Sequence, residues 1–454
     1  MSKTIFITIF QGLEAKNILR TGILTNLLKV PNLRIVFFVK SRERARYYEE
    51  EFQDPRIIYE VAPMPPLQGL DWFLGKLKFT LLKTPTTDLK RRFILESNKN
   101  YLAYYCRSFI NLLMARPLGR RIARALDYWL VKNDIYAPYF DKYKPDLVFL
   151  AHLFDESEIH LLRAAKKRKI KTVGFINSWD KVTARCILRI LPDKCVVFND
   201  IVKRELMKHD EVAEADIFVS GIPHYDHYFN EERSSRSDFF RKIKISPQKK
   251  LIVYASAGRA QSEADLEMIA LLTELLKQGE LGRQADLLVR FQPNDFIDAK
   301  ELATRLKVAY DYPGIRFSEK RGVDWDMNFD DLKHLKDTLY HMSALISYTS
   351  SMCIDAAIFD KPVININFEL HPNAPAHKLP TRYFKVDHYQ NVLRTGGVRL
   401  VGNREELTHW LKRYLANSSL DQAGRRKLVL EQCQYTDGRA GQRIADFLIS
   451  QMMT

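Results

Sequence analysis

Cysteine is scarce in this sequence, and its five copies follow no pattern that builds a site. They are Cys106, Cys186, Cys195, Cys353 and Cys433, an odd number without Cys-x-x-Cys spacing. Such a scattered set argues against both a disulfide framework and a structural zinc site. We therefore expect reduced thiols.

Long apolar runs are absent as well. No window approaches the roughly 20 uncharged apolar residues that a membrane-spanning helix needs. The first residues, MSKTIFITIFQGLEAKN, carry one lysine before a short apolar run and no small-residue cleavage site. This pattern predicts a first strand and not a signal peptide, so we expect a cytoplasmic protein.

Several cofactor and metal motifs are also missing. Neither G-x-G-x-x-G nor G-x-x-x-x-G-K-[S/T] occurs, which disfavours nicotinamide dehydrogenases and P-loop phosphotransferases. No Asp-x-Asp pair stands at a predicted strand end. His224 and His227 flank Asp226, but no further ligand lies nearby in the sequence. We expect no cofactor and no required metal.

Two series of alternating strands and helices are present. The first has strands at 5–10, 34–39, 147–150, 172–176, 194–198 and 216–220, with helices at 17–28, 41–52, 156–169 and 201–209. The second has strands at 251–255, 286–291, 344–347 and 363–367, with helices from a Ser262 cap to Gly279, at 330–341 and at 351–359. Alternation of this kind predicts parallel sheets with right-handed crossovers.

The expected fold is therefore α/β, with two doubly wound Rossmann-like domains facing a central cleft. The polar stretch 230–250 predicts the linker between them. We place an N-terminal acceptor domain at 1–235 and a C-terminal nucleotide-donor domain at 249–435. A last helix at 436–454 is expected to pack back toward the N-terminal domain, and a helical insertion is expected at about 63–133.

The net charge of +16 favours an anionic partner. Residues 55–135 hold 14 Lys or Arg and 6 Asp or Glu, half of that excess. Apolar residues recur there at helical spacing with lysines beside them: Trp72, Phe73, Leu74, Leu77 and Leu81, with Lys76, Lys78 and Lys83. This pattern is typical of a helix on an anionic membrane surface, and equally of a core-packed stripe with solvated lysines.

Polar residues follow three predicted strands of the N-terminal half, where parallel sheets place their ligands. Trp179 and Asp180 follow the strand at 172–176, His152 and Asp155 follow the strand at 147–150, and Glu14 follows the first strand. A carboxylate in a cleft can act as general base for an acceptor hydroxyl. Alternatively, Asp180 caps a helix.

Three predicted strands of the C-terminal half end in residues suited to phosphates. Arg259 follows one strand, and Arg290, Gln292 and Asn294 end the next. Guanidinium groups can neutralise a diphosphate leaving group. The third strand runs through Thr349, Ser350 and Ser351 into a helix that holds Asp355, forming either an anion site with a ribose contact or ordinary hydroxyl capping.

The order of several short motifs carries a resemblance. They are NSWDKVTAR, VVFNDIVKRELMKH, VSGIPHYDHYF, YASAGRA, VRFQPND, SYTSSMCIDAAIFDKPVI and DGRAGQRIADFL. Over about 145–448 the chain resembles bacterial cell-surface polysaccharide glycosyltransferases of the GT-B fold. It is more distantly similar to teichoic-acid CDP-glycerol glycerophosphotransferases.

The resemblance implies a nucleotide-sugar donor and a glycan or lipid-linked acceptor, as in lipopolysaccharide or capsule synthesis. In the glycerophosphotransferases a histidine and a glycine follow the tryptophan matched by Trp179. Asp180 replaces that histidine here, which implies an Asp base and inverting sugar transfer. By the same resemblance Arg259, Gln292, Ser350 and Ser351 bind the donor phosphates, with Gln292 standing where histidine is usual.

Alternative functions differ in chemistry. A nucleotide-sugar 2-epimerase has a similar two-domain fold, and a CDP-glycerol-type glycerophosphotransferase transfers a different group. A nucleic-acid-binding protein agrees with the charge of +16, but no nucleic-acid module is visible and the basic surplus lies in an apolar segment. We expect a metal-independent glycosyltransferase, peripheral on the inner face of the cytoplasmic membrane.

Overall fold

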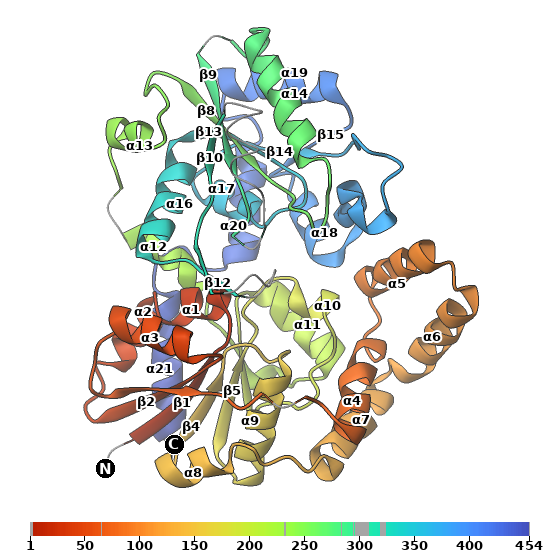
Figure 1. The fold of residues 1–454 in the computed structure, drawn as a ribbon, viewed down its shortest axis with the longest axis vertical. Coiled ribbons are helices and arrows are strands. Elements are labelled where there is room, and N and C mark those ends of the chain that lie inside the picture. Colours follow the sequence, from red (N-terminus) through yellow and green to blue (C-terminus); the bar gives the residue numbers. More distant parts are fainter. Residues whose placement is uncertain are drawn as a thin grey trace. The chain divides into compact units, whose positions relative to one another are not determined.

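The computed structural model describes residues 3–64, 66–230, 233–282, 284–293, 295, 308–317 and 324–453. They form two compact units, each built on a parallel sheet (Figure 1). The first unit comprises Met1–Arg91, Asn100–Asn230 and Gln432–Thr454, and the second comprises Arg92–Lys99 and Glu231–Glu431.

The first unit contains a seven-stranded sheet in the order β3-β2-β1-β4-β5-β6-β7, with every pair parallel. Its strands are β1 (Lys3–Ile9), β2 (Leu33–Val39), β3 (Ile57–Val61), β4 (Leu147–Leu150), β5 (Lys171–Phe175), β6 (Lys194–Val197) and β7 (Ile217–Val219). Central strands such as LVFL are apolar throughout because both of their faces are buried. Strand order reverses between β1 and β4, which makes their carboxyl ends the switch point of the sheet.

Helices cover this sheet, and one of them differs from the prediction. They are α1 (Gly12–Ile18), α2 (Gly22–Leu27), α3 (Arg42–Glu51), α8 (Ala137–Tyr143), α9 (Glu156–Lys167), α10 (Lys181–Ala184), α11 (Asp200–Asp210), α12 (Asp226–Asn230) and α21 (Ala440–Met453). The single helix expected at 17–28 is wrong. Thr21 is extended, and its hydroxyl accepts a 3.3 Å hydrogen bond from the Ile23 N–H, so a new helix begins there.

The last helix, α21, returns to the first unit and packs on α2. Two glycines permit this approach, because a Cβ on Gly441 would lie 2.8 Å from the backbone nitrogen of Gly22. The carboxylate of Asp226 accepts hydrogen bonds from the N–H groups of Ala440 at 2.9 Å and Gly441 at 2.7 Å. The Asp226 side chain therefore holds the start of α21 in place.

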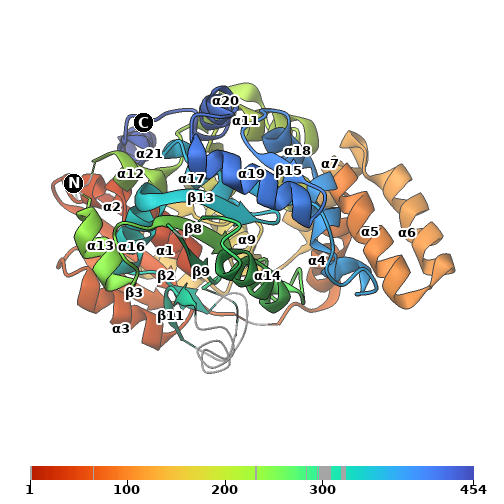
Figure 2. The same ribbon diagram turned by 90° about the horizontal axis from the view of Figure 1, so that it is seen from above.

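Residues 69–130 form four helices, drawn in orange in Figure 2: α4 (Gly69–Thr80), α5 (Pro85–Asn98), α6 (Tyr101–Met114) and α7 (Pro117–Leu130). α4, α6 and α7 pack against one another. Their small apolar core contains Leu81, Leu82 and Ala123 from this segment and Ile187 from the loop before β6.

A buried ion network holds this helical insertion to the sheet. The Arg189 guanidinium lies 2.6 Å from a carboxylate oxygen of Asp71 in α4, 2.6 Å from Asp127 in α7 and 2.5 Å from Glu156 in α9. Arg163 of α9 also contacts Asp127, at 2.5 Å. Each charge is compensated, so the network fixes where α4 and α7 dock.

The second unit has a six-stranded parallel sheet in the order β10-β9-β8-β13-β14-β15. Its strands are β8 (Lys250–Ala255), β9 (Ala285–Arg290), β10 (Ala309–Asp311), β13 (Met342–Ser347), β14 (Val363–Ile366) and β15 (Arg399–Val401). A small antiparallel pair, β11 (Ile315–Arg316) and β12 (Trp325–Asp326), lies outside it. The order reverses between β8 and β13, which is the switch point of this unit.

Among the described residues of this unit, the α-helices include α13 (Arg236–Lys242), α14 (Asp265–Lys277), α16 (Phe329–His341), α17 (Met352–Ile358), α18 (Asp387–Leu393), α19 (Arg404–Ala416) and α20 (Gln422–Cys433). The Ser262 cap is misplaced in the prediction. Its hydroxyl accepts a 3.0 Å bond from the Ala264 N–H, and α14 begins only at Asp265.

The structure describes the state of the cysteines and the length and polarity of the helices. All five cysteines are free thiols, of which only Cys106 is exposed. Within the described part of the chain, every helix is too short or too polar to cross a membrane.

Replacing Arg189 with alanine is expected to destabilise the protein strongly. It leaves the buried carboxylate of Asp71 without its closest partner and leaves Asp127 with Arg163 alone, and loss of a buried partner costs about 3–5 kcal/mol in comparable networks. Urea unfolding measures the loss. The matched control is Arg46→Ala on the exposed face of α3, expected to change stability by no more than about 0.5 kcal/mol. Equal midpoints for the two variants would contradict the clamping role.

Candidate active site

Two buried carboxylates lie at the switch point of the first unit. Oε2 of Glu14 accepts hydrogen bonds from the N–H groups of Phe10 and, at 3.0 Å, Gln11. Glu158 accepts from the Thr8 hydroxyl at 2.6 Å and from the His152 N–H at 2.8 Å. The loops after β1 and β4 are thus each tied to a buried carboxylate. Oε1 of Glu14 is also buried and finds no hydrogen-bond partner within the described residues.

The charges of this cluster shift one another's pKa values. Burial raises the pKa of Glu14 to about 7, although Lys181 opposes the shift. Burial, reinforced by Glu14, raises the pKa of Glu158 well above its usual value. Burial lowers the pKa of Lys181 to about 8, with Glu14 acting in the opposite direction. Groups that titrate near neutrality are suited to proton transfer.

The loop after β5 carries Trp179, Asp180 and Lys181. The side chain of Asp180 accepts a hydrogen bond from the Ser178 hydroxyl. Asp180 stands at the N-cap of α10, as the capping alternative predicts, but its side chain makes no capping hydrogen bond. Trp179 and Asp180 are half-buried, and the amine of Lys181 donates to Oδ1 of Asn177 at 2.6 Å.

His152 and Asp155 lie on the loop after β4. His152 is buried, and this burial holds its pKa well below the usual value, so the ring is neutral at neutral pH. Its Nδ1 has no hydrogen-bond partner in the part of the chain that the structure describes. Asp155 caps α9 through a 2.9 Å bond from the Ser157 N–H, and its charge raises the pKa of Glu14. The structure therefore brings Glu14, His152 and Asp155 together with Lys181.

In the second unit, the loop after β8 holds Arg259 on a braced backbone. Asp265 accepts from the N–H groups of Ala257 at 2.9 Å and Gly258 at 2.8 Å. Gly258 has φ +76°, a conformation that favours glycine. The Arg259 guanidinium is exposed and has no hydrogen bond or ion pair with another described residue.

Gln292 supports the same loop from the end of β9. Its amide donates to the carbonyl oxygen of Ala257 at 2.9 Å, and a Cβ on Gly258 would lie 3.1 Å from Gln292. The Arg259 N–H donates to the Asp295 carboxylate at 3.1 Å. Asn294, expected to share this position, lies outside the described residues.

The sequence predicts Arg290 as a donor-binding residue, and the structure places it inside the second unit. It is buried and lies 3.3 Å from the carboxylate of Asp311 in β10, which also lies 2.8 Å from His334. Burial alone would raise the pKa of Asp311, but the bonds from His334 and Arg290 hold it below its usual value. Arg290 thus belongs to an internal ion pair.

Residues that directly follow β8 and β13 carry hydroxyls without hydrogen-bond partners among the described residues. Oγ of Ser256, the hydroxyl of Tyr348 and Oγ1 of Thr349 are all buried without a hydrogen-bond partner among the described residues. Buried polar groups are rarely left unsatisfied, so this edge is suited to a hydrogen-bonding ligand. Asn365 fixes the turn by donating to the carbonyl oxygen of Tyr348 at 3.0 Å.

Ser350, Ser351 and Asp355, which follow this turn, differ in burial and in hydrogen bonding. Ser350 accepts a 3.3 Å bond from the Met352 N–H, Ser351 is exposed at the N-cap of α17, and Asp355 is buried inside that helix. α17 has seven residues. The unpartnered hydroxyls are therefore a stronger indication of a ligand than the start of this short helix.

Sequence reasoning missed the residues that brace both edges. Glu158, Thr8, Asp265 and Asn365 stand inside ordinary helices and strands, so no local pattern distinguishes them. Across the described residues, no three His, Cys, Asp or Glu side chains are grouped to hold a metal ion. His224 Nδ1 instead lies 2.7 Å from Oδ1 of Asn17.

The fold and the two edges define a class, the GT-B fold with two Rossmann-like domains. The family model for CDP-Glycerol:Poly(glycerophosphate) glycerophosphotransferase matches residues 191–450. This is more than half of the chain, so the protein belongs to that family. No curated protein sequence matches the chain.

Solved structures share the fold at low sequence identity. UDP-GlcNAc 2-epimerase from Neisseria meningitidis bound to UDP-GlcNAc has 12% identity and a TM-score of 0.54, with 99% of this chain and 100% of that chain covered. The wall teichoic acid polymerase TagF with CDPG has 13% identity, a TM-score of 0.53 and coverage of 99% and 88%. A glycosyltransferase from Rickettsia africae has 12% identity, a TM-score of 0.51 and coverage of 99% and 99%.

The comparisons confirm the GT-B fold class and the resemblance to teichoic-acid glycerophosphotransferases. The family match also establishes that the protein is a transferase. The domain boundaries, the individual site residues, the expected cleft and the absence of a required metal stay predictions.

Glu14→Gln is expected to change how stability depends on pH. Because the folded pKa of Glu14 is about 7 and the unfolded value is 4.5, the wild type loses stability from this group as pH rises through 7. The variant keeps an acceptor for the Gln11 N–H but cannot ionise. Its melting temperature relative to the wild type should therefore rise between pH 4.5 and 7.

Glu43→Gln on the exposed face of α3 is the control, and its difference from the wild type should stay constant over this range. Glu158 is present in all three proteins, but the Glu14 charge helps to raise its pKa, so Glu14→Gln also lowers the pKa of Glu158 and the measured difference reports both carboxylates. A constant difference for Glu14→Gln as well would show that Glu14 titrates normally.

Proposed function

We propose that the protein transfers a sugar from a nucleotide-sugar donor to a hydroxyl of a membrane-associated glycan or lipid-linked acceptor. The observation that carries this proposal is the group of unpartnered hydroxyls beside the exposed Arg259. It supports a phosphate-bearing donor at the carboxyl edge of the second unit. Membership of a nucleotide-dependent transferase family supports the same donor class.

The donor site is built from residues of the β8, β9 and β13 edge. Arg259 pairs with the diphosphate, and the hydroxyls of Ser256, Tyr348 and Thr349 donate to its oxygens. Gln292 holds the Arg259 loop in place. Ser350 and Ser351 complete the phosphate contacts, and Asp355 is the candidate for the ribose.

The acceptor hydroxyl is activated by the first unit. Asp180, replacing the family's histidine, removes the proton as the hydroxyl oxygen attacks the anomeric carbon. The bond from that carbon to the diphosphate oxygen breaks, and the nucleoside diphosphate leaves with inversion. Trp179 and Asp155 line the acceptor side, and Glu14 and His152 are the alternative bases. No step requires a metal.

Glycerophosphate transfer is the second candidate, and the family match favours it. In that reaction the acceptor oxygen attacks phosphorus, a phosphorus–oxygen bond of the diphosphate breaks, and a nucleoside monophosphate leaves. The released nucleotide thus separates the two reactions. A 2-epimerase would instead convert a nucleotide sugar without any acceptor.

Asp180→Asn and Arg259→Ala form a matched pair of tests. Asp180→Asn should bind nucleoside diphosphates normally but lose transfer by about 10²–10⁴-fold, the usual contribution of a general base. Arg259→Ala should weaken nucleotide binding at least about tenfold, the effect of one charge-assisted contact. Calorimetric titration and chromatography of released nucleotide measure the two effects. Near-normal turnover of Asp180→Asn would remove Asp180 from the base position, and an unchanged titration would remove Arg259 from the donor site.

We further propose that the helical insertion docks on an anionic membrane surface. Its exposed apolar residues support this: Leu70, Trp72, Phe73, Phe79, Ile94, Tyr101, Leu102, Tyr105, Phe109, Ile110, Leu112, Leu113, Leu118, Ile122, Leu126, Trp129 and Leu130. The basic surplus of the same segment supplies charge complementarity. The wholly core-packed alternative does not fit these exposures.

Vesicle flotation tests the membrane proposal. The wild type should float with phosphatidylglycerol-containing vesicles more than with phosphatidylcholine vesicles. Leu102→Glu, at a side chain 77% exposed on α6, should reduce flotation about tenfold or more, since burying one leucine contributes about 1.5–3 kcal/mol. Leu430→Glu, at a leucine 68% exposed on α20, should leave flotation unchanged. Failure of the wild type to float with either vesicle would contradict membrane docking.

A further inference from the structure

A cavity lies in the C-terminal unit, at the amino-terminal edge of its sheet. Its volume is about 780 Å³, and it lies where β8 begins at Lys250 and β13 begins at Met342. The unpartnered hydroxyls of Ser256 and Thr349 follow the opposite ends of these strands. The cavity is therefore separate from the proposed donor site.

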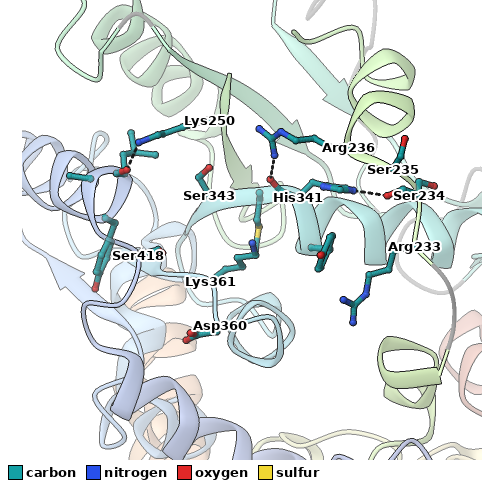
Figure 3. Close-up of a pocket in the computed structure, with 15 residues that line it drawn as sticks. Arg233, Ser234, Ser235, Arg236, Lys250, His341, Ser343, Asp360, Lys361 and Ser418 are labelled. Atoms are coloured by element: carbon teal, nitrogen blue, oxygen red, sulfur yellow. Dashed lines mark hydrogen bonds between the residues drawn. The ribbon is translucent and has the colours of Figure 1, made fainter. Parts of the chain in front are cut away.

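Cations dominate the lining of this cavity. Figure 3 shows Arg233, Arg236, Lys250 and Lys361 arranged around it, with Asp360 as the one carboxylate among the described lining residues. Asp360 already forms an ion pair with Arg425, because its Oδ1 lies 2.8 Å from Nε of that residue. The described lining residues thus leave a surplus of positive charge in the cavity.

Two of these cations are held in place by neutral groups. Arg236 donates to the carbonyl oxygens of Pro247 at 2.8 Å and Lys249 at 2.6 Å. Lys250 donates to the carbonyl oxygen of Leu415 at 2.6 Å. Carbonyl oxygens orient a cation but do not neutralise it, so both charges remain available to an anion.

Arg233 and Lys361 are the less constrained pair. The Arg233 guanidinium lies 4.4 Å from the centroid of the Tyr340 ring, and the Lys361 amine lies 5.7 Å from the same centroid. Lys361 is half-buried, and its side-chain amine has no hydrogen bond or ion pair with any other described residue. Burial lowers the pKa of Lys361, and the charges of Arg236 and Arg233 lower it further, whereas Asp360 opposes them. A bound anion would supply a hydrogen-bond acceptor and a negative charge for the Lys361 amine.

We propose that this cavity is a second anion-binding site that takes the phosphate group of a small molecule. A multiply charged phosphate matches several uncompensated cations better than a single carboxylate does. The volume of about 780 Å³ is within the usual range for a small-molecule site. The Ser343 hydroxyl on the lining adds a donor for a phosphate oxygen.

Protection of Lys361 from acylation tests the site residue by residue. The full chain is treated with an amine-acylating reagent with and without inorganic pyrophosphate, and the labelled lysines are read by mass spectrometry. Pyrophosphate at ten times its Kd should slow acylation of Lys361 about tenfold, because only the free fraction reacts. Lys277, exposed on α14, is the internal control and should react equally in both samples.

Variants separate this site from the donor site. Arg233→Gln should abolish the protection of Lys361, whereas Arg259→Ala at the donor edge should leave it intact. Protection by glycerol phosphate but not by inorganic pyrophosphate would identify a phosphate ester as the ligand, and the reverse would identify an inorganic phosphate. Equal acylation of Lys361 with and without all of these anions would overturn the proposal, whatever the fate of the donor site.

Discussion

Parallel pairing of every strand in both large sheets is the constraint on which the rest of the structure depends. It brings all carboxyl ends of a sheet to one edge, so residues far apart in the chain meet there. Glu14 and Glu158 meet because β1 and β4 are neighbours at the point where the strand order reverses. The same reversal between β8 and β13 assembles Ser256 with Thr349 in the second unit.

At both edges, some polar groups are satisfied and others are not. Glu158 and Asp265 are committed to backbone N–H groups and hydroxyls, which makes the surrounding loops rigid. Oε1 of Glu14 and Oγ1 of Thr349 are buried without partners among the described residues. Polar groups whose hydrogen bonds are made within the protein fix the shape of an edge. Polar groups without such bonds can still form hydrogen bonds to a substrate.

The helical insertion combines a buried polar base with an exposed apolar surface. Arg189 and its carboxylates fix α4 and α7 to the first unit by charge and geometry. This docking leaves side chains such as Leu102 and Trp129 in contact with solvent. An apolar face of this kind is costly for an isolated protein and useful for one that works at a membrane. The cavity around Lys361 is a separate charged feature, whose described lining holds four cations and one carboxylate, Asp360, that is paired with Arg425.

The sequence by itself determined the α/β class, the alternation of strands and helices, and the family resemblance, because apolar periodicity and short motif order are local properties. It also identified Asp180, Glu14 and Arg259 as candidates, since each directly follows a predicted strand. Only the tertiary structure decided that Arg290 is paired with Asp311 and that Lys181 lies near Glu14. Burial and pairing depend on contacts between distant segments, and no local pattern encodes them. The break between α1 and α2 is another feature that no local pattern encodes. At this break Gly22 packs against Gly441, and these two glycines are more than four hundred residues apart in the chain.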